Sequence, residues 1–247
     1  MKPIQKPDGP TPGLVDYLSC AGEQATYDGF RSHQAGDAYR KLVSALECIQ
    51  HGLCGYCEID ITEQDRQVEH VIPQSDPEHG KDRVLDPENM IVCCKGGTSK
   101  NPDAARWQKP SKNNRSCGEA KENRVDPKCI DPGDLPALPL LMRVNYETGQ
   151  ISADAEVCKD ASIDVSKVEE TIRILGLNVD RLKVARREHW RALSKYLANS
   201  EDIREAARRE LLPEEGSHRL KKFFSTTRSY FGPVAEEILA ETPQEWI

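Results

Sequence analysis

The chain has 247 residues, of which 37% are hydrophobic, and this length is enough for a sizeable core in one or two domains. The 34 Lys and Arg residues are outnumbered by 41 Asp and Glu residues, so the formal net charge is −7 and strong unaided binding to a polyanion is not expected. The 16 Gly and 16 Pro residues show no period, which excludes a collagen-like protein. No stretch approaches ~18 consecutive apolar residues, so no transmembrane helix is expected.

Nine cysteines are the most informative part of the composition. The N-terminal residues lack the apolar segment of a signal peptide, which predicts a cytoplasmic location, where thiols stay reduced. The odd count and the clustering between positions 48 and 129 therefore indicate metal binding for some cysteines. Four cysteines lack partners at ligand spacing and are expected to be small buried hydrophobes: Cys20, Cys48, Cys129 and Cys158.

The first section, residues 1–47, is expected to contain an arm and helices. Residues 1–13 hold four prolines, which predicts an extended arm. From residue 14 to about residue 50, apolar residues recur at three- and four-residue spacing, which predicts helical structure. The clearest of them are Tyr39, Leu42, Val43, Leu46 and Ile49.

The second section, residues 48–125, is rich in Cys, Gly and polar residues, with too little apolar periodicity to form a large core alone. Cys54 and Cys57 form a Cys-x-x-Cys pair, whose spacing lets two thiolates bind one Zn²⁺ tetrahedrally. A redox pair would need a βαβ setting, which the flanking sequence does not predict. The nearest cysteines that could complete a zinc site are Cys93, Cys94 and Cys117.

Glu69 and His70 lie between the two groups of cysteines, and a carboxylate beside an imidazole suits a hydrolytic site. On a strand the two side chains would point to opposite faces, unless a bend or bulge brings both into one cleft. A pair of solvated turn residues is the alternative interpretation. Asn89 comes nineteen residues after His70 and is either a functional residue or an ordinary turn or cap residue.

The third section, residues 126–247, begins with a proline-rich linker, since four prolines lie within residues 126–139. Two short apolar segments flank a Glu-Thr-Gly turn and predict a hairpin over residues 142–153.

Helices are expected over most of the remaining sequence. Ser166 and Glu169 match a capping box, and Asn178 is a candidate cap for the helix that follows. Two further helices are expected over residues 203–212 and 234–239. The chain is therefore predicted to be an α+β protein, in which a small zinc-dependent centre is embedded in mostly helical structure.

The order Cys-x-x-Cys, Glu-His-x-x-Pro, Asn and Cys resembles the HNH (ββα-metal) nuclease family. The sequence is more closely similar to the HNH subunits of Septu-type and retron-associated anti-phage defence systems. This resemblance runs from about residue 40 to residue 190. The matching segments are Gln50–Glu58, Val68–Pro73, Asn89–Cys94, Cys117–Lys121 and Thr171–Asn178.

The resemblance implies a zinc-stabilised ββα-metal core and a role for each matching residue. His70 would be the general base, and Glu69 would hold a catalytic Mg²⁺ or Mn²⁺ ion. Asn89 would fix the loop next to His70 through hydrogen bonds to its backbone. The structural zinc ligands would be Cys54, Cys57, Cys94 and Cys117.

The sequence departs from the commoner HNH pattern at two points. Twenty-two residues separate Cys94 from Cys117, where a second Cys-x-x-Cys pair is usual. Gly118 follows the last zinc cysteine, where the family often has an Asn or His that binds the catalytic metal. The candidates for this third ligand are Asn114, Glu119 and Asn123, of which Asn123 is favoured.

Basic residues cluster in two places despite the acidic total. The insert Lys95–Ser116 holds six cationic residues and one acidic residue, and it is the better nucleic-acid candidate because it adjoins the proposed site. Trp107 within the insert either stacks on a base or packs against the insert. The helix expected over residues 180–195 also carries six cationic residues, for which a solvated face is an equally good interpretation.

The function we expect is a metal-dependent HNH endonuclease that hydrolyses phosphodiester bonds, with DNA the favoured substrate. The family resemblance implies that it is the effector of an anti-phage complex with an ABC/SMC-like ATPase partner. In a retron setting, a reverse transcriptase and its RNA–DNA product are further candidate partners. Two alternatives stay open: a nuclease that cleaves RNA such as tRNA, and a non-catalytic zinc-stabilised module that binds nucleic acid or a partner.

Overall fold

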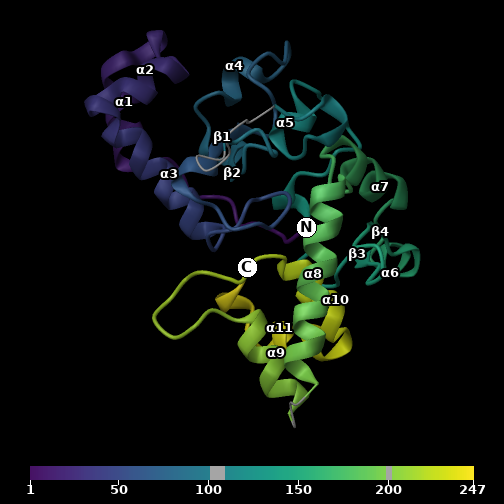
Figure 1. Ribbon diagram of the computed structural model, residues 1–247. Helices are drawn as coiled ribbons and strands as arrows, with labels where there is room; N and C mark the ends of the chain where they lie inside the picture. The colour runs from purple at the N-terminus through teal and green to yellow at the C-terminus, as the bar shows by residue number, and fades with distance from the viewer. Residues whose placement is uncertain (101–108, 199–201) are drawn as a thin grey trace.

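The computed structural model describes residues 1–100, 109–198 and 202–247, and Trp107 and Arg106 lie outside these ranges. Short helices and two small antiparallel sheets make up the described chain (Figure 1). The helices are α1 (Pro12–Ala21), α2 (Tyr27–Ser32), α3 (Asp37–Ile49), α4 (Gly80–Arg83), α5 (Gly118–Lys121), α6 (Ala155–Asp160), α7 (Val165–Ile174), α8 (Asp180–Leu197), α9 (Ile203–Leu211), α10 (Phe224–Phe231) and α11 (Pro233–Glu241). The strands are β1 (Gln67–His70), β2 (Met90–Cys93), β3 (Met142–Val144) and β4 (Ile151–Ala153).

The helical region expected near the N-terminus is divided into α1, α2 and α3. Thr26 caps α2, because its side chain accepts a backbone hydrogen bond of 3.0 Å from the first turn. Gly36 has a φ of 81° directly before α3, a conformation that favours glycine. Leu42, Val43 and Leu46 lie on the buried face of α3, as their spacing predicts.

The proline-rich arm is extended, as expected, and its first residues are buried. The backbone N–H of Ile4 donates to the carbonyl oxygen of Pro132 at 3.1 Å. The α-amino group of Met1 lies 3.3 Å from the carboxylate of Glu58, the residue that follows the Cys-x-x-Cys pair. The arm therefore packs against both the cysteine-rich section and the proline-rich linker.

The β1–β2 pair lies at the centre of the second section. Its register is regular, with Glu69 opposite Ile91 and with His70 in the last pair. The side chain of Gln50 fixes the other edge of β2: its Nε2 donates to the carbonyl oxygen of Val92 at 2.7 Å, and its Oε1 accepts from the Val92 N–H at 2.7 Å. All four β2 residues are buried. The β2 strand therefore connects two parts of the section. It pairs with β1, which carries Glu69 and His70, and it accepts a backbone hydrogen bond from Gly55, which lies between Cys54 and Cys57.

The predicted hairpin is present as β3 and β4. Asn178 binds this hairpin, since its Oδ1 accepts from the Ile151 N–H at 2.9 Å and its Nδ2 donates to the Ile151 carbonyl oxygen at 2.8 Å. The prediction that Asn178 caps α8 is therefore wrong, and Val179 occupies the cap position. Ser166 is not the cap of α7 either, because the Asp164 carboxylate accepts from the Ser166 N–H at 2.8 Å.

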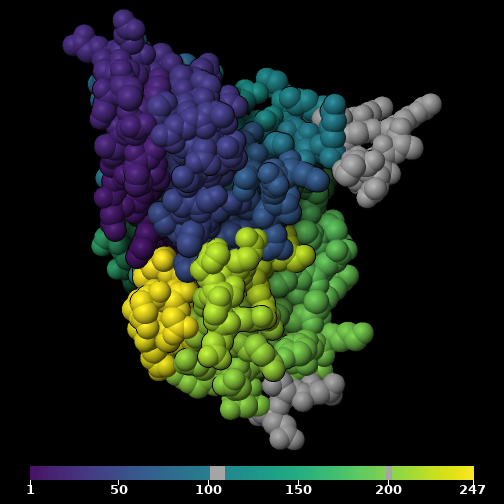
Figure 2. Space-filling model, turned by 90° about the vertical axis from the view of Figure 1, so that its left-hand side faces the viewer, coloured from purple at the N-terminus to yellow at the C-terminus, as the bar shows by residue number. Residues whose placement is uncertain are grey.

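Buried hydrophobic residues form two clusters. The first contains residues between Met1 and Leu182, and the second contains residues 193–246 together with Leu53. Helix α8 contributes Leu182 to the first cluster and Leu193 to the second, so it links the two parts of the molecule (Figure 1). Figure 2 shows the purple and blue N-terminal residues lying above the yellow C-terminal ones. Within the described ranges, no helix combines the length and apolar character needed to cross a membrane.

The cysteines without ligand spacing are only partly in the core. Cys158 is buried and Cys129 is half-buried, whereas Cys20 and Cys48 are exposed. The prediction that all four are buried hydrophobes is wrong for Cys20 and Cys48, because each lies on the solvent face of its helix, α1 or α3.

Candidate active site and metal centre

Four thiols meet where β2 ends. Cys54 and Cys57 come from the turn after α3, Cys94 directly follows β2, and Cys117 directly precedes α5. The Sγ–Sγ distances are 3.7 Å for Cys54–Cys117, 3.7 Å for Cys57–Cys94 and 3.6 Å for Cys94–Cys117. A tetrahedral zinc with Zn–S bonds of about 2.3 Å requires sulfur atoms about 3.8 Å apart. The four thiols that the sequence singles out therefore have the spacing of a zinc ligand set.

Burial disfavours thiolates in this cluster unless a cation is bound to them. The four side chains are between 0% and 5% exposed, and burial raises the pKa of the Cys117 thiol well above its ordinary value. A bound Zn²⁺ ion would reverse that effect, because it stabilises thiolates. Cys93 is not a member of the cluster, and its Sγ lies 3.8 Å from Nε2 of Gln67.

His70 is the last residue of β1, and its ring is held on three sides. Its Nε2 lies 3.0 Å from the carbonyl oxygen of Val84, which can only accept, so Nε2 carries the proton. In the neutral ring Nδ1 is therefore the acceptor, and it takes a hydrogen bond of 3.3 Å from the amide of the exposed Gln74. The ring edge packs on Tyr27, with the ring centroids 4.8 Å apart. Burial lowers the pKa of His70, which keeps the imidazole in its basic form near neutral pH.

Glu69 points to the opposite face of β1, as a regular strand requires, and no bulge interrupts the register. Its Oε1 lies 3.0 Å from Nζ of Lys121, and the same Nζ donates to the carbonyl oxygen of His70 at 3.1 Å. Lys121 thus joins the carboxylate to the backbone of the neighbouring histidine. Burial raises the pKa of Glu69, and the ammonium of Lys121 opposes that rise.

Asn89 braces the turn that follows β1. Its Oδ1 accepts from the N–H of Ile72 at 2.7 Å, and its Nδ2 donates to the carbonyl oxygens of Ile72 and Arg83, both at 3.0 Å. The side chain is buried, so these bonds satisfy all of the groups that it removes from water. Both Val84, which contacts His70, and Ile72 belong to the backbone that Asn89 holds.

Gly118 lies directly against Glu69. A Cβ placed on Gly118 would be 2.4 Å from Oε2 of Glu69, so a side chain at this position would displace the carboxylate. The usual Asn or His after the last cysteine would therefore fit here only if the Glu69 carboxylate moved. Among the candidates for a third metal ligand, Asn114 and Asn123 are exposed, and Glu119 is half-buried with its carboxylate 3.9 Å from Nζ of Lys109. Within the described residues no hydrogen bond or ion pair joins any of the three to Glu69.

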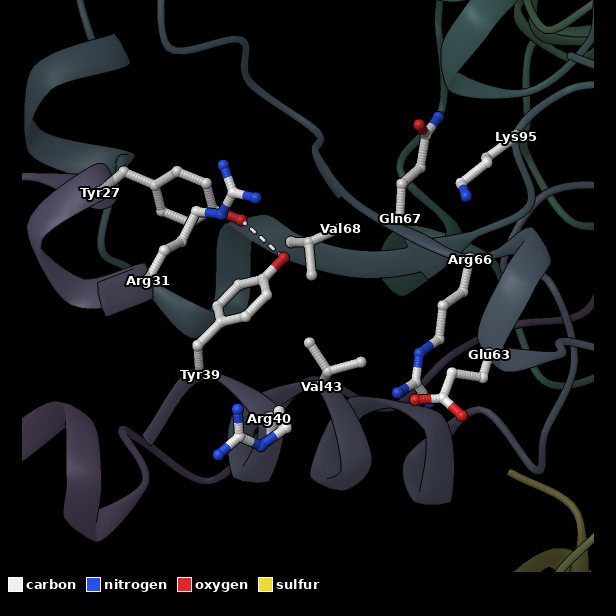
Figure 3. Close-up of a pocket in the computed structure, with 10 residues that line it drawn as sticks. All are labelled: Tyr27, Arg31, Tyr39, Arg40, Val43, Glu63, Arg66, Gln67, Val68 and Lys95. Atoms are coloured by element: carbon white, nitrogen blue, oxygen red, sulfur yellow. Dashed lines mark hydrogen bonds between the residues drawn. The ribbon is translucent and has the colours of Figure 1, made fainter. Parts of the chain in front are cut away.

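A groove of about 520 Å³ opens beside β1 (Figure 3), and Tyr27, which lines it, packs on His70. One wall comes from α2 and α3, and the other comes from β1 and the residues on either side of the β1–β2 pair. We call it the Tyr27 groove, and its lining residues are Tyr27, Arg31, Tyr39, Arg40, Val43, Glu63, Arg66, Gln67, Val68 and Lys95. Sequence patterns did not reveal this groove, because its cations are distant along the chain.

The two basic segments have different roles in the structure. On α8, Arg186 is buried and donates to the carbonyl oxygens of Gly149 and Leu177, and Arg181 donates to the Ser116 hydroxyl. These two arginines hold the fold together. In the insert, Lys95 lines the Tyr27 groove.

Lys121 is the residue of the site to which the sequence patterns assigned no role. A usable signal was present, because Lys121 lies four residues after Cys117 and therefore one helical turn along the same face. That spacing places the ammonium of Lys121 beside β1, where it contacts Glu69 and the His70 carbonyl oxygen.

These features define a mixed helical and sheet protein around a four-cysteine centre that could bind zinc. No protein-family model matches the chain. It is 30% identical over 224 residues to a protein named as the HNH endonuclease of retron Ec83 from Escherichia coli, covering 82% of this chain and 83% of that protein. It is 21% identical over 194 residues to one named for retron Vc95 from Vibrio cholerae serotype O1 biovar El Tor, covering 76% and 82%. The chain therefore belongs to the family of retron HNH endonucleases, and the expected nuclease identity is confirmed.

Proposed function

We propose that this protein cleaves nucleic acid by metal-dependent hydrolysis at the Glu69–His70 pair, with DNA as the favoured substrate. The observation that carries this proposal is the hydrogen bonding of His70. Because its Nε2 donates to Val84, the neutral ring presents Nδ1 as a base. The lowered pKa of His70 keeps that base unprotonated at working pH.

In the proposed reaction His70 takes a proton from the water that attacks the phosphorus. A P–O bond to water then forms, the bond to the 3′ oxygen breaks, and the leaving oxygen is protonated from solvent. A Mg²⁺ or Mn²⁺ ion would neutralise charge on the phosphate as this happens. Asn89 would keep the backbone around His70 in place during the reaction.

Glu69 is the carboxylate we propose for that ion. Because Glu69 and His70 lie on opposite faces of β1, the end of the strand or the Glu69 side chain has to turn for both to reach one phosphate. Mg²⁺ is commonly held by one or two carboxylates together with water and substrate phosphates, so a single acidic side chain fits. Lys121 occupies one oxygen of Glu69, and it would have to share or release that oxygen. For the third ligand Asn123 remains our candidate from the sequence, although Glu119 is supported by its charge, which contributes to raising the pKa of Glu69.

We propose that Cys54, Cys57, Cys94 and Cys117 hold a structural Zn²⁺ ion, and that an anti-phage complex is the setting in which the nuclease acts. The retron names of the relatives support a reverse transcriptase and its RNA–DNA product as partners. An ABC/SMC-like ATPase partner rests on the family resemblance. The chain's net charge of −7 favours delivery of the substrate by such a partner.

The test is cleavage of supercoiled plasmid and of total tRNA by the wild type and by His70→Ala. Each substrate is incubated with Mg²⁺, Mn²⁺ or a chelator, with and without the products of neighbouring genes. We expect metal-dependent cutting of plasmid that falls by about 10²-fold or more in His70→Ala, since general-base catalysis contributes about 10²- to 10⁴-fold. His79→Ala is the matched control, because this histidine is exposed on the loop after β1.

Zinc content and melting temperature should be nearly unchanged in His70→Ala, because His70 is not in the thiol cluster. Loss of zinc in this variant would show that His70 is a structural ligand. Cutting of tRNA alone would establish the RNA alternative. The absence of cutting of either substrate, with partners present and zinc bound, would favour the non-catalytic binding module.

A further inference from the structure

We propose that the Tyr27 groove binds the sugar–phosphate backbone of the substrate strand next to the site of cleavage. This inference rests on the proposed nuclease function. It assigns to the N-terminal helices α2 and α3 a direct role in holding nucleic acid, outside the strands and cysteines that build the nuclease centre.

The charge of the groove is opposite to that of the whole chain. Four of the ten lining residues are cationic and one is anionic, whereas the chain carries a net charge of −7. Phosphate groups are the anions that a nuclease must hold, and contacts to them supply affinity that does not depend on base sequence. The lining therefore suits a polyanionic strand.

Arg31 and Arg40 lie on the helical wall, and their existing ion pairs are weak. Arg31 is 3.7 Å from Asp28, Arg40 is 3.6 Å from Asp37, and the arginine side chains are 54% and 60% exposed. Exposed pairs of this kind contribute little to stability, so a phosphate can replace the carboxylate at little cost. Neither Asp28 nor Asp37 lines the groove.

Lys95 and Arg66 lie toward the other end of the groove, away from Arg31 and Arg40 (Figure 3). Nζ of Lys95 donates to the carbonyl oxygen of Gln64 at 2.6 Å, and within the described residues it makes no direct ion pair. Arg66 is held by Glu47 at 2.6 Å, which fixes it as part of the wall. Cations at both ends indicate an extended ligand with several phosphates.

Tyr27 connects this groove to the proposed general base. The same tyrosine that lines the groove packs its ring on His70, and its hydroxyl donates to or accepts from that of Tyr39 at 3.3 Å. A strand lying along the groove therefore reaches the Tyr27 end beside the base. An acidic protein would also meet the cations, but the proximity to His70 favours the substrate strand.

The test is salt-dependent binding of a labelled 30-nucleotide DNA, and of the same sequence as RNA, by fluorescence anisotropy. All proteins carry His70→Ala, so that no cleavage disturbs the titration. The variants are Arg31→Ala/Arg40→Ala and Lys95→Ala, and Arg31→Lys/Arg40→Lys keeps the charge. The control is Arg204→Ala/Arg208→Ala, which removes two exposed, ion-paired arginines from α9 in the C-terminal part.

The double alanine variant should bind about tenfold or more weakly, and its slope of log K against log[salt] should fall by about 0.7 per lost single-strand phosphate contact. The lysine variant should retain most of the slope, and the control should match the parent. Melting temperature and zinc content verify that each variant is folded.

Equal affinity and slope in the groove variants and the control would overturn the inference, as would a parent protein that binds neither oligonucleotide. Loss of assembly with a partner protein, while oligonucleotide binding persists, would place a protein in the groove and also overturn it. A failure of the proposed nuclease function would give a different result from a failure of the groove inference. The wild type would then bind nucleic acid through the groove but cleave neither substrate with any metal.

Discussion

The four-thiol cluster and the Glu69–His70 pair lie at opposite ends of the same two short strands, and they satisfy their polar groups in different ways. In the cluster the four Sγ atoms face one another, within 3.6–3.7 Å for the closest pairs. Glu69 and His70 face away from each other and depend on partners from elsewhere, namely Lys121 and the carbonyl oxygen of Val84. A closed set of four ligands, such as the thiol cluster, is suited to a structural metal site. Side chains that are held by other segments, such as Glu69 and His70, are suited to binding and reacting with a substrate.

This comparison predicts that damage to the cluster affects folding and that damage to the pair affects activity. The largest effect is expected for Cys54→Ser. Binding of a structural zinc is folding free energy, of order ~10 kcal/mol for comparable sites, so this variant should lose both zinc and the folded core. Metal analysis and thermal melting measure the two losses.

Cys20→Ser is the matched control, because Cys20 is an exposed thiol on α1. It should keep the zinc content, the melting temperature and the cleavage rate of the wild type. A Cys54→Ser protein that stays folded and active without zinc would break the comparison.

Asn89→Ala should have an intermediate effect on both properties. The variant leaves the N–H and the carbonyl oxygen of Ile72 without their partner, and it leaves the Arg83 carbonyl oxygen with only the Asp86 N–H at 3.4 Å. A buried group left without a hydrogen bond costs about 1–3 kcal/mol, so the melting temperature should fall while zinc remains bound. Cleavage should fall further than stability explains, because the backbone around His70 loosens.

Chemical denaturation and cleavage assays at a temperature where the protein stays folded separate the two effects. Asn114→Ala, an exposed asparagine, is the control. Unchanged cleavage by a folded Asn89→Ala protein would show that this residue serves stability alone.

The smallest expected effect is a shift in pH dependence for Tyr27→Ala. Cleavage needs neutral His70, so activity is lost as the pH falls through the lowered pKa of that group. Removing the Tyr27 ring admits water, which weakens the burial that lowers this pKa. The acidic limb of the profile should therefore move to higher pH, toward the ordinary histidine value of about 6.5.

Tyr27→Phe keeps the ring on His70 and removes only the hydroxyl, so its acidic limb should stay with that of the wild type. The measurement is kcat/KM between pH 5 and pH 8 for the three proteins. Coincident acidic limbs for Tyr27→Ala and the wild type would mean that Tyr27 does not contribute to the environment of His70.

Local patterns were sufficient for much of the molecule. The hairpin at residues 142–153, the helix at 203–211 and the buried stripe of α3 follow from turn residues and from three- and four-residue periodicity. The cap of α7 was misassigned because Asp164, two residues before Ser166, accepts the backbone hydrogen bond at the start of the helix. The cap of α8 was misassigned because Asn178 binds the hairpin instead. The exposed Cys20 and Cys48 were misplaced because cysteine composition does not reveal which helix face meets a core.

The sequence by itself determined the family and the four members of the cysteine cluster, because cysteine spacing and the Glu-His pair are local and chemically restrictive. Tertiary structure alone decided three other features: the joining of Glu69 to Lys121, the orientation of His70 by Val84, and the Tyr27 groove. Each depends on contacts between segments that are distant along the chain. The physical reason is that a ligand set is selected by chemical type, whereas a general base and a groove are defined by what packs around them.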